Sequence, residues 1–141
     1  MADTALIKKL QLKGQPLVLL NLPGHLDGLF PENALRAEAM PKNAGAVLGF
    51  AENRGELDKL IRLILSQIGP DAILWLAYPK KTSKRYQSDI TRDHGWGLLA
   101  AYHYEPVRQI ALDEDWSALR FKPFALIDNP VRKGKMIKPD A

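Results

Sequence analysis

Three apolar runs of strand length are the clearest pattern along this chain. They cover residues 17–22, 46–51 and 72–78. Pro23 follows the first run and Pro79 follows the third, and short apolar runs bounded in this way are typical of β-strands. Strands that are apolar at nearly every position are buried on both faces, as in a parallel sheet that is covered by helices. We therefore expect a mainly parallel sheet.

The segment between the second and third runs predicts an amphipathic helix. Asn53 followed by Glu56 forms a capping-box-like start, in which the Asn side chain accepts an early backbone N–H. Gly69 and Pro70 predict its end, because glycine suits a left-handed cap and proline cannot continue a helix. Apolar side chains recur at helical spacing and form one stripe, namely Leu57, Leu60, Ile61, Ile64, Leu65 and Ile68.

The second half of the chain predicts a further helix and a hairpin. Ser88 is a suitable N-cap for a helix that runs to about His103, with a break possible at Gly95. Residues 107–113 and 116–123 read as strands joined by two residues, too short a link for a parallel crossover, so they predict an antiparallel hairpin.

These elements together predict one α/β domain, residues 1–124, followed by a basic C-terminal tail, residues 125–141. The expected architecture is a three-layer sandwich with a mainly parallel sheet and an antiparallel C-terminal hairpin. Residues 34–40 fit either a short strand or one and a half turns of helix, and we leave both open. A chain of 141 residues is long enough to bury a core without a metal or disulfide.

Composition narrows the chemistry. The chain has no cysteine, which excludes thiol catalysis, disulfides, thiolate zinc sites and iron–sulfur clusters. No apolar run approaches the roughly 20 residues of a membrane span, and residues 1–12 show no signal-peptide pattern. We therefore expect a cytoplasmic protein without membrane contact.

Three stretches resemble a family of small bacterial proteins that is classed as a domain of unknown function. Residues 10–15, running into residues 17–21 and Pro23, are similar to its opening strand. Residues 74–83 carry Trp75-x-x-Tyr78-Pro79-Lys80, and residues 113–121 carry Asp113-x-x-Trp116-Ser-Ala-Leu-Arg-Phe. Since that family has no established activity, the resemblance implies a fold and no catalytic residue.

The order of elements is also similar, more distantly, to S-adenosylmethionine-dependent methyltransferases. That resemblance implies a Rossmann-like sheet, a Gly-rich cofactor turn at residues 21–28 and an acidic ribose partner such as Glu38. The turn here has no G-x-G and contains Pro23. We therefore expect a methyltransferase-like sheet that has lost cofactor binding or never had it, and we predict no cofactor.

Positive charge is concentrated in one segment. The chain has 20 Lys and Arg and 16 Asp and Glu, a net charge of +4. Residues 80–92 alone carry five bases and one acid. They follow a strand, and the carboxyl ends of parallel strands are where such sheets bind ligands. With N–H groups of a helix starting near Ser88, this segment predicts a phosphate-type anion site; the alternative is a solvated basic loop. The candidate ligands are Lys80, Lys81, Thr82, Ser83, Lys84, Arg85, Arg92 and, from the hairpin, Arg120.

Other chemistry finds little support. His94 and His103 fall on opposite sides of the predicted helix, and His25 lies beside Asp27 in a distant loop, so no metal site is predicted. No G-x-S-x-G or P-loop pattern is present. Trp116 and Arg120 share one face of a strand, where they either edge a cleft or pack in the core.

The function that follows from these patterns is a non-catalytic binding or regulatory domain for a small anionic ligand. One alternative is a degenerate or cryptic S-adenosylmethionine-dependent enzyme. Another is a weak nucleic-acid accessory protein that uses residues 80–92 and the basic tail, with salt-sensitive affinity. The oligomeric state stays open.

Overall fold

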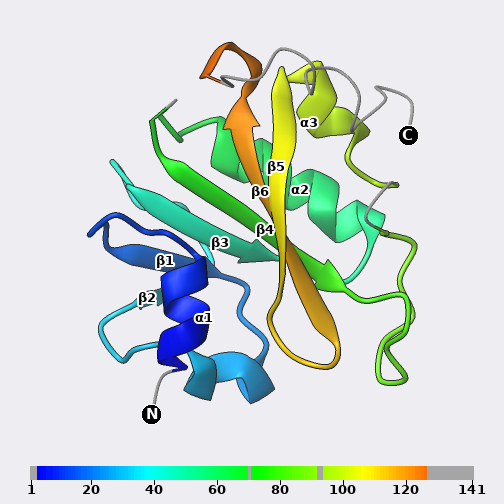
Figure 1. Ribbon diagram of the computed structural model, residues 1–141. Helices are drawn as coiled ribbons and strands as arrows, with labels where there is room; N and C mark the ends of the chain where they lie inside the picture. The colour runs from blue at the N-terminus through cyan, green and yellow to red at the C-terminus, as the bar shows by residue number, and fades with distance from the viewer. Residues whose placement is uncertain (1–2, 70, 92–93, 127–141) are drawn as a thin grey trace.

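The computed structural model describes residues 3–69, 71–91 and 94–126, which form a mixed six-stranded sheet with helices (Figure 1). The sheet order is β2-β1-β3-β4-β6-β5. Its strands are β1 (Leu17–Leu20), β2 (Leu35–Ala37), β3 (Ala46–Phe50), β4 (Ile73–Pro79), β5 (Tyr104–Ala111) and β6 (Trp116–Pro123). The helices are α1 (Thr4–Lys9), α2 (Arg54–Leu65) and α3 (Gly97–Ala101), with 3₁₀ turns η1 (Gly24–Leu29) and η2 (Phe124–Leu126).

The first four strands are parallel, and the C-terminal hairpin reverses the pattern. β6 pairs antiparallel with both β4 and β5, so it lies between two strands that precede it in sequence. Asp113 closes the hairpin, because its Oδ1 accepts the backbone N–H of Asp115 and of Trp116, both at 2.8 Å. The predicted antiparallel hairpin and the mainly parallel remainder of the sheet are therefore present.

Helices pack on both faces of this sheet. α1 lies in front of the sheet in Figure 1 and α2 lies behind it. On the α1 face, Trp75 and Trp116 pack with η1, and the Trp75 Nε1–H donates to the carbonyl of Leu10 at 3.0 Å. On the α2 face, Tyr78 and Trp96 pack with α2 and α3. Continuous apolar strands thus have both faces covered, as their sequence predicts.

The predicted helix between the second and third runs is confirmed as α2. The Asn53 Oδ1 accepts the N–H of Glu56 at 2.9 Å, and the Glu56 carboxylate accepts from the Asn53 side chain at 3.0 Å. Helix and sheet approach closely at Gly49, where a Cβ atom would stand 2.8 Å from the Leu60 side chain. α2 ends at Leu65, one turn before the predicted Gly69 stop.

The predicted helix from Ser88 to about His103 is wrong. Of the described residues in this range, 88–91 and 94–103, only 97–101 are helical. Ser88 Oγ accepts the N–H of Ile90, which closes a local turn in place of a helix cap. Thr91 and His94 form an isolated β-bridge, and Gly95 has a φ of +108°, which a continuous helix does not permit.

Three further segments are residues 34–40, the short helix α1 and the predicted tail. Of the alternatives for residues 34–40, the strand is present, as β2. The short helix α1 has no counterpart among the predicted elements; Asp3 caps it by accepting the Leu6 N–H at 3.0 Å. Of the predicted tail, residues 125 and 126 belong to η2 and the remainder lies outside the described residues.

Within the described ranges, no helix has the length and apolar character that crossing a bilayer requires.

Candidate ligand site at the carboxyl edge of the sheet

A cleft of about 660 Å³ opens beside the carboxyl end of β4, on the α2 face. We call it the carboxyl-edge cleft. It is lined by Arg54, Tyr78, Lys80, Lys81, Thr82, Asp89, Thr91, His94, Gln109 and Ser117. The first three residues of the predicted basic segment, Lys80, Lys81 and Thr82, therefore line a cavity at the edge of the sheet where a parallel arrangement predicts a ligand.

The basic loop is held in place by the hairpin turn. The Lys80 N–H donates to the Asp115 carbonyl at 2.7 Å, and the Ser83 hydroxyl donates to the Asp115 carboxylate at 2.8 Å. Ser83 Oγ in turn accepts the backbone N–H of Arg85 and of Tyr86. These contacts stabilise one loop conformation, which places the Lys80 and Lys81 side chains along the cleft.

The amino end of α2 forms another part of the wall, and a carboxylate already contacts it. The Arg54 backbone N–H donates to the Asp89 Oδ1 at 2.8 Å, so Asp89 takes the place an external anion would have at this helix end. The Arg54 side chain lines the cleft as a third cation beside Lys80 and Lys81.

The floor of the cleft is polar and aromatic. Gln109 Nε2 donates to the Tyr78 hydroxyl at 3.0 Å. Tyr78 meets Trp96 edge-on, with ring centroids 5.4 Å apart, and the Trp96 Nε1–H donates to the Thr91 carbonyl at 2.8 Å. The buried Trp96 therefore connects the loop that carries Thr91 and His94 to the sheet.

The other predicted ligands are distributed differently. The Ser83 hydroxyl makes its hydrogen bonds to Asp115 and within the loop, and Ser83 does not line the cleft. Lys84 and Arg85 are exposed and do not line the cleft, and Arg92 lies outside the described residues. No helix begins at Ser88, so the helix N–H groups that the prediction placed there are absent from the site.

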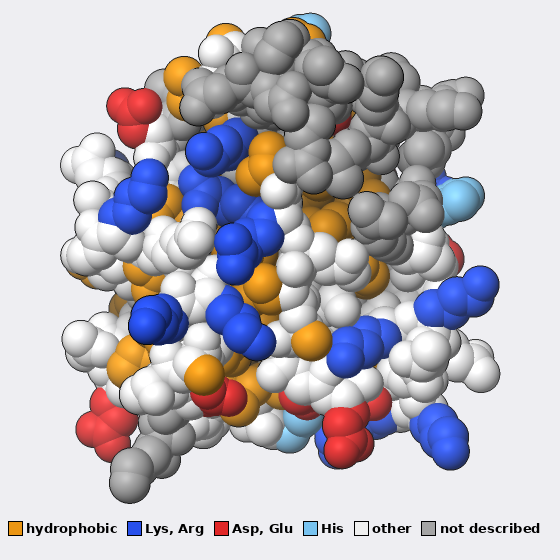
Figure 2. Space-filling view, viewed as in Figure 1, with side chains coloured by type: hydrophobic (Ala, Val, Ile, Leu, Met, Phe, Trp, Pro, Cys, Tyr) orange, Lys and Arg blue, Asp and Glu red, His pale blue; other side chains and the backbone are white. Residues whose placement is uncertain are grey.

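Arg120 lies toward the opposite edge of the sheet. It pairs in register with Trp75 near the start of β4, whereas Trp116 pairs with Pro79 at the end of that strand. Four residues along a strand span about 13 Å. Arg120 is 8% exposed, burial lowers its pKa, and it lines a separate hollow of about 220 Å³ with Lys13 and Lys122. On the side of the molecule where α1 lies, which Figure 2 shows, Lys and Arg side chains gather near the centre.

Trp116 does not edge a cleft with Arg120. Its side chain is fully buried and packs edge-on against Phe50 and Tyr86, with ring centroids 5.5 and 5.2 Å apart. Of the two roles that the sequence leaves open for Trp116, the structure has core packing.

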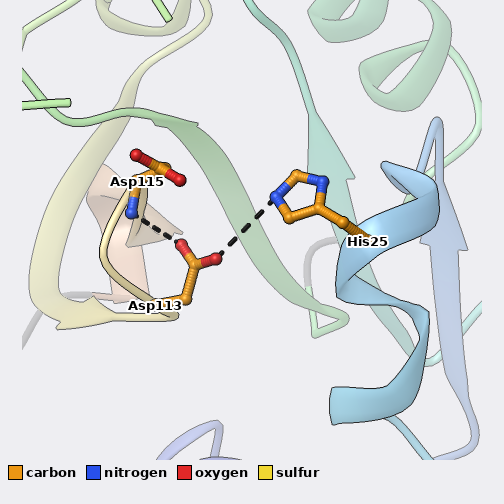
Figure 3. Close-up of side chains that lie close together, drawn as sticks. All are labelled: His25, Asp113 and Asp115. Atoms are coloured by element: carbon orange, nitrogen blue, oxygen red, sulfur yellow. Dashed lines mark hydrogen bonds and ion pairs between the residues drawn. The ribbon is translucent and has the colours of Figure 1, made fainter. Parts of the chain in front are cut away.

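A second polar group lies at the same edge, on the α1 face of the sheet. His25 from η1 faces Asp113 and Asp115 from the hairpin turn (Figure 3). His25 Nε2 is 3.8 Å from Asp113 Oδ2, and one ligand atom from each of the three residues lies within 4.8 Å of the other two. We call these residues the His25 cluster. Sequence spacing does not reveal it, because His25 is 88 residues from Asp113.

A further hollow of about 480 Å³ lies where β1 and β2 end. Asn21 and Gly24 line it after β1, and Glu38 lines it directly after β2. Arg36 Nε donates to Asp27 Oδ1 at 2.7 Å beside them. Glu38 is the residue for which the methyltransferase resemblance implies the role of an acidic partner at the end of a second strand.

The comparisons with known proteins identify no family. No family model matches the chain, and no curated protein does. One solved structure that resembles it is a LepI variant in complex with SAH and a substrate analogue. The match has 13% sequence identity and a TM-score of 0.47, and it covers 86% of this chain. The chain spans 40% of the length of that protein.

Proposed function

We propose that this chain binds a small phosphate-bearing ligand in the carboxyl-edge cleft, as a non-catalytic binding or regulatory domain. The observation that carries the proposal is the convergence of Arg54, Lys80 and Lys81 on one cavity. Among the described residues that line the cleft, Asp89 is the one with a carboxylate, and that carboxylate already accepts a backbone N–H of α2. The cleft therefore has an excess of positive charge and donors suited to phosphate oxygens.

The size and polarity of the cleft indicate the ligand class. Cavities of roughly 300–1,000 Å³ accommodate cofactor- or drug-sized molecules. Gln109 and the hydroxyl groups of Thr82 and Ser117 add neutral hydrogen-bonding groups, and Tyr78 adds an aromatic surface. This lining suits a phosphorylated small molecule of up to nucleotide size.

The test compares two pairs of cations in the same loop. We expect Lys80→Gln/Lys81→Gln to weaken binding of ADP or pyrophosphate at least tenfold, since each charge-assisted hydrogen bond contributes about 1.5–3 kcal/mol. Isothermal titration calorimetry at fixed ionic strength measures this. The matched control is Lys84→Gln/Arg85→Gln, which removes the same charge outside the cleft and should change affinity less than about threefold.

Two outcomes would contradict the proposal. One is that the protein binds none of these phosphates. The other is that both double variants weaken binding equally, which would mean diffuse attraction of polyanions. Strongly salt-dependent binding of oligonucleotides, unaffected by Lys80→Gln/Lys81→Gln, would favour the nucleic-acid alternative.

A second candidate function is binding of S-adenosylmethionine or a related nucleoside in the hollow beside Glu38. The supporting observation is that an acidic residue, Glu38, directly follows β2 and lies next to the residues that follow β1. The methyltransferase resemblance implies an acidic residue at this place. We further propose that the chain is a single cytoplasmic domain with a three-layer, Rossmann-like architecture.

The nucleoside candidate predicts a ligand-dependent stabilisation. S-adenosylmethionine at 100 times its dissociation constant should stabilise the fold by about 2.7 kcal/mol, visible as a raised melting temperature. Glu38→Gln should remove most of that rise, while Glu32→Gln, an exposed residue outside the hollow, should leave it unchanged. An unchanged melting temperature in the unmodified protein would eliminate this candidate.

A further inference from the structure

The His25 cluster combines two kinds of metal-ligand atom that arrive from separate parts of the chain. η1 contributes an imidazole nitrogen, and the β5–β6 turn contributes two carboxylates (Figure 3). We propose that His25, Asp113 and Asp115 bind a divalent transition-metal ion. The proposal uses none of the residues that line the carboxyl-edge cleft.

The distances lie close to those of a metal site. Metal–ligand distances of about 2.1 Å place the ligands of a tetrahedral site about 3.4 Å apart. His25 Nε2 and Asp113 Oδ2 are 3.8 Å apart, and the whole set lies within 4.8 Å. Small side-chain rotations would close the difference, and the His25 side chain is 26% exposed, so it has room to move.

Both carboxylates have one oxygen held and one available. The Asp113 Oδ1 accepts two backbone N–H groups of the turn, and its Oδ2 faces His25. The Asp115 Oδ1 accepts the Ser83 hydroxyl. Hydrogen bonds of this type orient ligating carboxylates, so Ser83 would act as a positioning residue.

The negative charge of the two carboxylates also favours a bound cation. Asp113 and Asp115 present two carboxylates within 4.8 Å of each other, and like charges at that separation oppose one another. Within residues 3–69, 71–91 and 94–126, no Lys or Arg side chain lies within 4.0 Å of either carboxylate. The neighbouring Lys80 and Lys81 line the cleft on the other face of the sheet. A divalent ion would compensate both charges at once.

The mixed donor set selects the class of ion. Imidazole favours zinc, iron, copper and nickel, whereas Mg²⁺ and Ca²⁺ prefer oxygen ligands alone. Three protein ligands leave at least one coordination position for water or an exogenous ligand, as in catalytic zinc sites. The Asp113 side chain is 26% exposed, so solvent reaches this edge.

The experiment measures metal binding by the untagged full-length protein after removal of metal with a chelator. Zn²⁺ and Co²⁺ are titrated by calorimetry, Co²⁺ is also followed by visible absorption, and Mg²⁺ and Ca²⁺ are the contrasting ions. We expect one equivalent of Zn²⁺ or Co²⁺. His25→Ala, Asp113→Asn and Asp115→Asn should each weaken binding at least about 100-fold, and Ser83→Ala about tenfold.

The controls separate this site from metal binding elsewhere on the chain. His103→Asn and Asp58→Asn remove a histidine and a carboxylate outside the cluster and should leave affinity within about twofold. Asp113→Asn and Asp115→Asn keep the shape and one acceptor oxygen of each side chain, so circular dichroism should show an unchanged fold without metal. Absence of Zn²⁺ and Co²⁺ binding, equal affinity in cluster and control variants, or a preference for Mg²⁺ would each overturn the proposal.

Discussion

Replacing Trp75 with alanine should lower the free energy of unfolding by about 3–5 kcal/mol, the usual range for removing a buried tryptophan. Trp75 is fully buried at the centre of β4, on the face that α1 covers. The substitution would leave a cavity between the sheet and α1, and it would leave the Leu10 carbonyl without its donor. Small domains have total stabilities of about 5–15 kcal/mol, so this variant should be close to unfolding.

Trp75→Phe separates packing from hydrogen bonding at the same position. It keeps most of the aromatic volume and loses only the N–H that Leu10 accepts, so the expected loss is about 1–3 kcal/mol. Equilibrium unfolding in urea, followed by circular dichroism, measures both variants. If phenylalanine destabilised the protein as much as alanine does, the argument from cavity formation would be incorrect.

Trp96→Ala should reduce both stability and ligand affinity. Trp96 is fully buried between Tyr78 and Phe121, with ring centroids 5.4 and 5.2 Å away, so its loss should destabilise the fold by about 3–5 kcal/mol. Its N–H also holds the Thr91 carbonyl, and Thr91 lines the carboxyl-edge cleft. We therefore expect the affinity for ADP or pyrophosphate to fall at least tenfold under conditions where the variant is folded.

Two controls test the link between Trp96 and the cleft. Trp96→Phe retains the ring packing without the N–H, and should retain more stability than the alanine variant while still weakening binding. Tyr102→Ala removes an aromatic side chain that is 47% exposed, and should change neither property appreciably. A Trp96→Ala protein that binds the ligand with unchanged affinity would show that Trp96 does not position the loop.

The elements with strong local patterns were predictable, and those without were not. The apolar runs correspond to β1, β3 and β4, and the capped stripe corresponds to α2, since each repeats a local signal over a whole element. The six residues of α1 repeat their pattern too few times to be recognised. The predicted helix from Ser88 failed because Gly95 and the Thr91–His94 bridge interrupt it.

Some residues of the candidate sites were likewise predictable from a local sequence pattern, and others were not. Lys80 and Lys81 were predictable because they follow a strong strand at its carboxyl end. Arg54 was not among the predicted ligands, because the local pattern shows only that it lies at the start of the helix that became α2. Gln109 and the His25 cluster gave no signal, because their positions depend on where β5 and β6 lie in the sheet.

The amino-acid sequence by itself determined the class of fold, the absence of cysteine chemistry and the segment where positive charge gathers, because composition and periodicity are local properties of the chain. Only the tertiary structure decided which charges meet. Inserting β6 between β4 and β5 directs Arg120 toward one edge of the sheet and the Asp113–Asp115 turn toward the other, where η1 presents His25. Such meetings are set by strand order and register, which join residues far apart in sequence.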